Sequence, residues 1–171
     1  ALLLKDGVSI DATGATIEAF KNNGTHGGFV SFQSCENSHV TGGTWIGDKA
    51  LHSPLPTGEF CFAFFFTASI NCSIKNAIIK NSRGDGIDIE PDHSYSGNWG
   101  SVDGVVTGNV VTENYGDGIT IFRSSGLTVV GNIVSRNGER GISFRGDVSD
   151  TVVSSNVVKY AGLRAAANSD T

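Results

Sequence analysis

Two carboxylates in a strand-like run are the residues of this chain best suited to acid–base chemistry. Asp88 and Glu90 lie in "GDGIDIEP" (84–91), where apolar and polar residues alternate. Alternation with a period of two predicts a β-strand and places both carboxylates on one face, with Cα atoms about 6.7 Å apart. Such a pair suits glycoside hydrolysis, in which one carboxyl protonates the leaving oxygen and the other activates water or attacks the sugar. We therefore predict Asp88 and Glu90 as catalytic acid and base or nucleophile.

A polar and aromatic stretch, "DHSYSGNW" (92–99), begins two residues after Glu90. A histidine transfers protons near neutral pH, and tyrosine and tryptophan offer flat rings with a polar tip to a sugar. We expect His93 to orient or stabilise charge during catalysis. We expect Asp92, Tyr95 and Trp99 to bind substrate.

The sequence around these residues is repetitive, and the repeat predicts the fold. Three segments share a turn followed by Gly-Ile and an alternating run: "GDGIDIEP" (84–91), "GDGITIFR" (116–123) and "ERGISFRG" (139–146). Gly118 and Gly141 are 23 residues apart, as are Asn109 and Asn132. A period of this size, with short strands and no helix in each repeat, predicts a parallel β-helix whose strands stack about 4.8 Å apart. We expect one all-β domain over 1–171, a single-stranded solenoid of about five to six turns.

The same spacing extends the register to earlier rungs that begin at Phe29 and Phe62. In this register, Ile87 and Ile89 point inward, whereas Asp88 and Glu90 point outward. The other residues expected on the outward face are Phe64, Phe66, Phe122 and Arg145, with Arg123 at the end of its strand. We expect the three phenylalanines to hold sugar rings, and Arg123 and Arg145 to orient substrate or stabilise charge as part of the catalytic site.

Recurring asparagines predict ladders at the turns. Asn76, Asn109, Asn132 and Asn156 are expected to stack as one set, and Asn81, Asn114 and Asn137 as another. Stacked asparagine side chains satisfy buried backbone groups of the turns. Asp85 and Asp117 lie in Gly-Asp-Gly turns, and we attribute them to turn chemistry.

In two places the interval between equivalent positions is longer than the usual repeat spacing. The extra residues predict inserted loops at 47–59 and 91–101. Long loops of solenoids often build the binding face, so these two are expected to wall a groove. The three cysteines, Cys35, Cys61 and Cys72, lack metal-ligand spacing and are expected to be buried thiols.

Composition narrows the partners of the chain. The net charge is −5 and the sequence has no broad basic stripe, which argues against nucleic acid. No apolar run approaches the roughly 20 residues that span a bilayer, so we expect no membrane insertion. The chain starts without methionine, apparently within a strand, and we expect it to be a fragment of a longer helix or a processed form.

The stretches "SSGLTVVGNIVSRNGERGISFRG" (124–146) and "LLLKDGVSIDATGATIEAF" (2–20) resemble the right-handed parallel β-helix, pectate-lyase-like superfamily. This resemblance implies a right-handed helix of the kind found in phage tail spikes and secreted polysaccharide depolymerases. It also implies a polysaccharide substrate, an extracellular, secreted or virion-tail location, and a homotrimer or larger assembly.

Two other functions fit the same residues. A uronate lyase or C5-epimerase would use arginines near the sugar carboxylate and a base such as His93 or Tyr95. A non-catalytic shaft or glycan-binding module of a larger assembly would need no base at all. We expect no resident metal, although calcium has possible oxygen ligands in Asp85, Asp88, Glu90 and Asp92.

Overall fold

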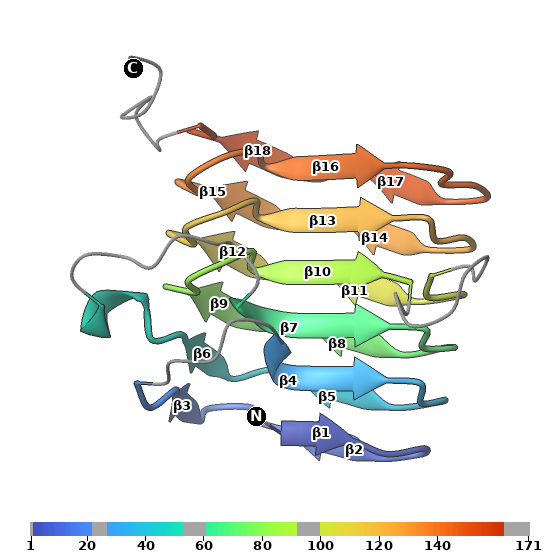
Figure 1. Cartoon of the computed structure of the whole chain (residues 1–171), viewed down its shortest axis with the longest axis horizontal. Helices are drawn as coiled ribbons and strands as arrows, with labels where there is room; N and C mark the ends of the chain where they lie inside the picture. The colour runs from blue at the N-terminus through green and yellow to red at the C-terminus, as the bar shows by residue number, and fades with distance from the viewer. Residues whose placement is uncertain (1, 22–26, 53–60, 92–99, 163–171) are drawn as a thin grey trace.

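The computed structural model describes residues 2–21, 27–52, 61–91 and 100–162. These residues form three parallel sheets of six strands each, and every strand pairs with its equivalent in the next repeat (Figure 1). The chain visits sheets A, B and C in turn and then returns to sheet A one rung further along. The prediction of an all-β parallel β-helix with five to six turns is confirmed.

Sheet A carries the longest strands and the candidate carboxylates. It begins at the N-terminal rung and contains β1 (Leu2–Leu4), β4 (Gly27–Gln33), β7 (Cys61–Thr67), β10 (Ile87–Glu90), β13 (Ile119–Phe122) and β16 (Ile142–Arg145).

Sheets B and C consist of three-residue strands joined by tight corners. Sheet B contains β2 (Ser9–Asp11), β5 (His39–Thr41), β8 (Ser73–Lys75), β11 (Val105–Thr107), β14 (Thr128–Val130) and β17 (Val152–Ser154). Sheet C contains β3 (Thr16–Glu18), β6 (Thr44–Ile46), β9 (Ile78–Lys80), β12 (Val110–Thr112), β15 (Ile133–Ser135) and β18 (Val157–Lys159). One turn of 3-10 helix, η1 (Lys49–Leu51), follows β6. No helix among the described residues is long and apolar enough to cross a lipid bilayer.

The strands of sheet A turn alternate side chains into the core, where equivalent positions stack from rung to rung. The two inward columns of sheet A contain Val30, Phe64, Ile87 and Ile119, and Phe32, Phe66, Ile89 and Ile121, all at most 2 % exposed. Burying these apolar surfaces is the main favourable contribution to stability. The predicted inward positions Ile87 and Ile89 are confirmed.

Aromatic rings fill the core between the second and third rungs. The rings of Phe32 and Phe66 are stacked with centroids 4.1 Å apart, and Trp45 meets Phe64 edge-on at 5.1 Å. Offset and edge-to-face pairs of this kind add to the stabilisation that comes from burial alone. Phe64 and Phe66 therefore act as core residues.

The prediction that Phe64 and Phe66 face outward is wrong by one residue of register. Phe64 pairs with Ile87 and Phe66 with Ile89, so Phe65, which pairs with Asp88, is the outward residue. A slip of one residue exchanges the two faces of a strand. Because Phe64 and Phe66 lie in the core, they are not available to hold a sugar ring.

Buried asparagines form ladders at the corners, as predicted. Asn132 Oδ1 accepts hydrogen bonds from the backbone N–H and the Nδ2 of Asn109, at 2.9 and 3.0 Å. Asn156 receives the same pair from Asn132, both at 2.9 Å. Asn114 and Asn137 repeat the arrangement at the next corner. Each ladder satisfies backbone donors that the corners would otherwise bury without partners.

Asn76 and Asn81 lie one residue away from the ladders, so this part of the prediction is wrong. Ala77 and Ser82 occupy the ladder positions, and their backbone N–H groups donate to the asparagine of the next rung. Asn76 and Asn81 instead have positive φ values of 55° and 59°. Asparagine suits both a left-handed turn and a ladder, so residue type alone could not separate the two positions.

The register predicts that Phe64→Ala lowers the free energy of unfolding by about 3–5 kcal/mol, the usual cost of removing a fully buried phenylalanine. Urea unfolding measures the change. Phe144→Ala is the matched control, because Phe144 also points inward from sheet A but is 50 % exposed on the last described rung. An equal loss in the two variants would contradict the observed register.

The asparagine ladder predicts a second cost. Asn132→Ala removes the acceptor of Asn109 and the donor to the Val106 carbonyl, which lies 2.9 Å away. Each buried group left without a partner costs about 1–3 kcal/mol, so we expect a loss of about 2–4 kcal/mol on thermal or urea unfolding. Asn76→Gly, which keeps the left-handed turn outside the ladder, should change stability by less than about 1 kcal/mol.

Candidate functional site

Three polar columns run along the outward face of sheet A, across the strands. We name them by position, and they follow from the pairing of β7, β10, β13 and β16. The first column precedes the strands and contains Phe62, Asp85, Asp117 and Arg140. The second contains Phe65, Asp88, Thr120 and Ser143, and the third contains Thr67, Glu90, Phe122 and Arg145. Each column begins with an uncharged residue on the rung of β7, contains at least one carboxylate, and ends with a hydroxyl or a cation on the rung of β16.

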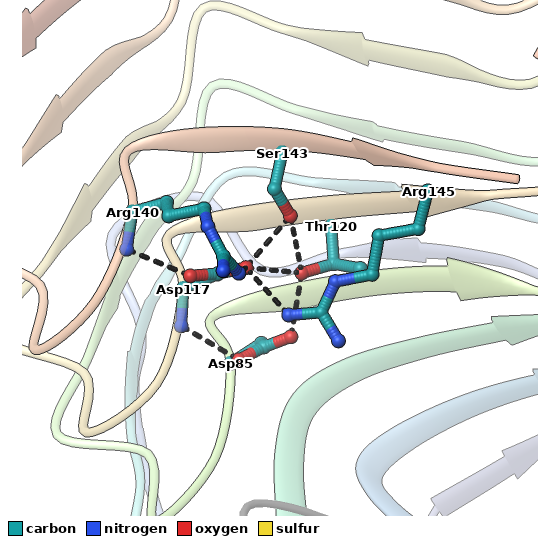
Figure 2. A network of polar contacts seen from close by, with 6 residues as sticks. All are labelled: Asp85, Asp117, Thr120, Arg140, Ser143 and Arg145. Carbon is teal, nitrogen blue, oxygen red and sulfur yellow. Dashed lines mark hydrogen bonds and ion pairs between the residues drawn. The ribbon is translucent and has the colours of Figure 1, made fainter.

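Asp117 is the anchor of a hydrogen-bond network that joins the last two of these rungs (Figure 2). Its Oδ1 accepts the backbone N–H of Arg140 at 2.7 Å. Its Oδ2 accepts hydrogen bonds from Ser143 Oγ at 2.6 Å and from an Arg145 Nη at 2.9 Å, and Arg140 adds an Nη contact at 3.4 Å. The side chain of Asp117 has no exposed surface, so these donors replace its hydration.

Asp85 repeats the arrangement one rung earlier with fewer donors. Its Oδ1 accepts the backbone N–H of Asp117 at 2.7 Å, and its Oδ2 accepts the Thr120 hydroxyl at 2.6 Å. The Thr120 hydroxyl also lies 3.2 Å from Asp117 Oδ2. One hydroxyl therefore stands between two buried carboxyls on neighbouring rungs (Figure 2).

Asp88 and Glu90 share the outward face of β10, as predicted, but both are buried. Asp88 is 4 % exposed and Glu90 is 9 % exposed. Asp88 Oδ1 is buried and has no hydrogen-bond partner among the residues that the structure describes. A buried carboxylate oxygen without a partner is costly, and protonation of the group lowers that cost.

The pKa values of the aspartates in the site shift in two directions. Burial raises the pKa of Asp85 to about 7, against the lowering effect of the Thr120 hydrogen bond. Burial, reinforced by the negative charges of Asp85 and Glu90, raises the pKa of Asp88 well above its usual value. Burial also acts to raise the pKa of Asp117, but hydrogen bonds from Ser143, the Arg140 backbone and Arg145 outweigh it and lower that pKa. Asp117 is therefore ionised at neutral pH, and the protonated form of Asp88 is favoured relative to an ordinary aspartate.

The structure brings together Asp88, Glu90 and Arg145 among the residues predicted for catalysis. The ion pair with Asp117 orients Arg145, and its positive charge acts on both Asp85 and Asp88.

Arg123 and Phe122 lie beside this group. The guanidinium of Arg123 stands over the Phe122 ring, 5.1 Å from its centroid, and Arg123 is exposed. The structure therefore places this pair at the margin of the carboxylates.

Sequence reasoning missed five members of the network: Asp85, Asp117, Thr120, Arg140 and Ser143. Turn chemistry explains Asp85 and Asp117 only in part, because both side chains bind groups on a neighbouring rung. The sequence did contain a signal for this network. In each repeat one polar residue directly precedes the Gly-Ile pair, and a second polar residue follows the glycine by two positions. Once the rungs are stacked, these positions form the first and second columns.

Several predictions lie outside the described residues. Asp92, His93, Tyr95 and Trp99 belong to this group, as does most of each predicted inserted loop. Their proposed contributions to substrate binding and charge stabilisation stay predictions.

Two hollows flank the carboxylates along the helix axis. One, of about 740 Å³, lies at the corner beside β4 and β7 and is lined in part by Phe29, Ser31 and Phe62. The other, also of about 740 Å³, is lined in part by Arg140, Ser143 and Arg145. Phe62 precedes Asp85 in the first column and Arg140 follows Asp117, so the hollows lie on opposite sides of the carboxylates.

Within the described part of the chain, no three His, Cys, Asp or Glu side chains are arranged to hold a metal ion. Asp92, one of the four calcium ligands considered from the sequence, is outside that part. Cys35 and Cys72 are buried, and Cys61 is partly buried. The Sγ atoms of Cys35 and Cys72 are 3.7 Å apart, and none of the three cysteines forms a disulfide.

Comparison with known protein families matches residues 5–169 to the family described as "Right handed beta helix region". No curated protein and no solved structure matches the chain. The family match covers nearly the whole sequence and agrees with the three parallel sheets.

The raised pKa values predict that the chain loses stability as the pH rises. Asp85 gives up its proton near pH 4 when unfolded but at about 7 when folded, so the folded state binds more protons between these values. The free energy of unfolding should therefore fall, on the order of 2–4 kcal/mol, as the pH rises from about 4 to about 8. Asp88 acts in the same direction.

Urea unfolding at several pH values checks this prediction. Asp85→Asn and Asp88→Asn should each flatten the pH dependence, because the amide is neutral throughout. Asp147→Asn, at an exposed position just after β16, is the matched control and should leave the slope unchanged. A wild-type slope that persists in both buried-site variants would contradict the assignment.

Proposed function

The chain belongs to the family of right-handed β-helix regions, and on this premise we propose that it recognises and cleaves an extracellular or cell-surface polysaccharide by glycoside-hydrolase chemistry. The observation that carries the proposal is the buried carboxyl pair on the outward face of β10, in which burial and the neighbouring carboxylates raise the pKa of Asp88 well above its usual value. Because proteins of this fold can have many different activities, these residues, and not the fold, support a hydrolase.

Asp88 is the general acid in this proposal. A carboxylic acid that holds its proton at neutral pH can donate it to the oxygen of the leaving sugar, and an apolar site next to other carboxyls produces such an acid. Phe65 stands beside Asp88 on the neighbouring strand and contributes apolar surroundings. Asp88 Oδ1, without a partner among the described residues, is the oxygen that would face the substrate.

Glu90 is the base or the nucleophile, and Arg145 stabilises charge. Glu90 follows Asp88 by two residues on the same face, which is the spacing expected of a carboxyl pair that brackets a glycosidic bond. Asp117 is unsuited to either catalytic task, because donors from three residues occupy its oxygens. Because Asp88 and Glu90 are covered in the free chain, substrate entry requires neighbouring side chains to move.

The hollows on either side of the carboxylates support a polymeric substrate. A glycan that lies along the helix axis would meet the half-buried ring of Phe29 on one side and Arg140 and Arg145 on the other. Aromatic rings pack against sugar faces, and guanidinium groups bind carboxylate or sulfate substituents. An extracellular, secreted or virion-tail location and a homotrimeric assembly belong to the same proposal and rest on the resemblance of the sequence.

A uronate lyase or C5-epimerase is the second candidate, and the arginines favour it. The side chains of Arg140 and Arg145 are 61 % and 45 % exposed, although each has one nitrogen on Asp117. Their remaining donors are available to neutralise a sugar carboxylate, which makes the neighbouring C5 proton more acidic.

A glycan panel tests the proposal. Wild-type chain, Asp88→Asn, Glu90→Gln and the control Asp147→Asn are incubated with capsular polysaccharides, alginate, pectin and neutral glycans. New reducing ends and the ultraviolet absorbance of unsaturated uronate products are followed together. We expect reducing ends without absorbance in the wild type and the control, and a loss of at least about 100-fold in each site variant, as for removal of a general acid or base.

The other outcomes separate the rival functions. Absorbance of unsaturated products would identify a lyase, and a changed uronate epimer ratio without chain cleavage would identify an epimerase. Glycan binding without any chemical change, equal in wild type and site variants, would overturn the hydrolase proposal in favour of a binding module or shaft.

A further inference from the structure

The ion pair between Asp117 and Arg145 has a geometry that the proposed catalytic roles do not use. Arg145 ends β16 in the third outward column, yet it reaches the first column, where its Nη lies 2.9 Å from Asp117 Oδ2. Figure 2 shows the guanidinium extending back past Thr120 toward Asp85. The side chain of Arg145 is 45 % exposed and would be better hydrated if it pointed away from the sheet. Its path along the outer face of the sheet, from the third column to the first, therefore needs a cause.

Asp117 supplies that cause. Its carboxylate is completely covered and is held in place by the Arg140 backbone N–H and the Ser143 hydroxyl, at 2.7 and 2.6 Å. A counter-charge stabilises this carboxylate further. Arg145 provides one in a charge-assisted hydrogen bond at 2.9 Å, and Arg140 adds a longer contact at 3.4 Å.

We propose that Asp117 is a positioning residue that clamps the Arg145 guanidinium over Asp85 and Asp88, and that the clamped guanidinium governs how readily these two carboxyls ionise. Among the described residues, the largest charge effects on Asp85 come from Asp117 and Arg145, and those on Asp88 come from Asp85, Glu90, Arg145 and Asp117. Arg145 is the only cation among these groups, so its placement opposes the negative charges. Arg140, the other arginine on Asp117, makes a longer contact and is more exposed. β7, on the other side, presents Phe62 and Phe65 and adds no charge to these columns.

Asp117 acts on the pKa values of Asp85 and Asp88 in two opposite ways. As a negative charge, Asp117 raises the pKa of both Asp85 and Asp88. As the clamp of Arg145, it lowers them by keeping a positive charge close. If positioning dominates, removal of the Asp117 charge raises the pKa of its neighbours, which is the reverse of the result expected from simple electrostatics.

A double-mutant cycle on the full chain tests the clamp. Carbon-13 NMR follows the side-chain carboxyls of Asp85 and Asp88 through a pH titration in wild type, Asp117→Asn, Arg145→Gln and the double variant. Arg145→Gln should raise both midpoints by about one pH unit or more, given the strength of a close charge at partial burial. Asp117→Asn should raise the Asp88 midpoint when Arg145 is present, because Arg145 acts on Asp88 more strongly than Asp117 does, and should lower it in the Arg145→Gln background.

The matched control is Arg136→Gln. Arg136 forms an exposed ion pair with Glu113, Nη to Oε1 at 3.1 Å, which also links neighbouring rungs but lies on sheet C. This variant should leave the midpoints of Asp85 and Asp88 unchanged.

Two outcomes overturn the proposal. An equal fall of the Asp88 midpoint on Asp117→Asn in both backgrounds would mean that Asp117 acts only as a charge. Unchanged midpoints in Arg145→Gln would exclude control by Arg145, and this exposed substitution stays informative even if Asp117→Asn does not fold.

The significance of the clamp for catalysis rests on the proposed function, whereas the titration needs no substrate. A chain that cleaves no glycan can still show the predicted midpoints, so failure of the glycan panel and failure of the clamp are separate results. If glycan cleavage is found, the pH at which it declines on the basic side should move with the Asp88 midpoint in Arg145→Gln.

Discussion

Stacking of equivalent residues on successive rungs is the constraint on which this molecule depends. Each strand of a parallel β-helix pairs with the rungs before and after it, so a side chain meets its own positional equivalents. An inward column must therefore be apolar throughout, as the isoleucine and phenylalanine columns of sheet A are. A corner column must satisfy its own backbone, which the asparagines achieve by accepting from one rung and donating to another.

The same constraint explains how the candidate site forms. Where a column contains a carboxylate in place of a neutral residue, the charge meets the next rung at close range and must be neutralised there. Asp117 accepts hydrogen bonds from the following rung, which lower its pKa, whereas Asp88 Oδ1 has no partner among the described residues and the pKa of Asp88 is raised. Stacked asparagines form a ladder of neutral hydrogen bonds, whereas stacked aspartates form a set of ionisable groups that affect one another's pKa values.

Much of the fold was predictable from the sequence, because the repeat period and the period-two alternation are local properties. They correctly indicated the parallel β-helix, its number of turns, the inward isoleucines, the outward carboxylates of β10 and most of the asparagine ladders. The errors are confined to the rung that runs from β7 to β9. There, Phe62–Phe66 is apolar on both faces, and asparagine precedes each ladder position, so neither alternation nor residue type indicated the register.

By itself, the sequence determined which residues alternate and how often the pattern returns, and hence the architecture and the outward position of Asp88 and Glu90. Only the tertiary structure decided that Phe65, and not Phe64, lies beside Asp88, and that Asp85, Asp117 and Arg145 form one network across three rungs. It also decided that the pKa of Asp88 is raised and that of Asp117 is lowered. The physical reason is that burial and counter-charge come from residues 23 to 35 positions away, as the contacts of Asp117 and Asp85 illustrate, and local patterns do not report what covers a side chain.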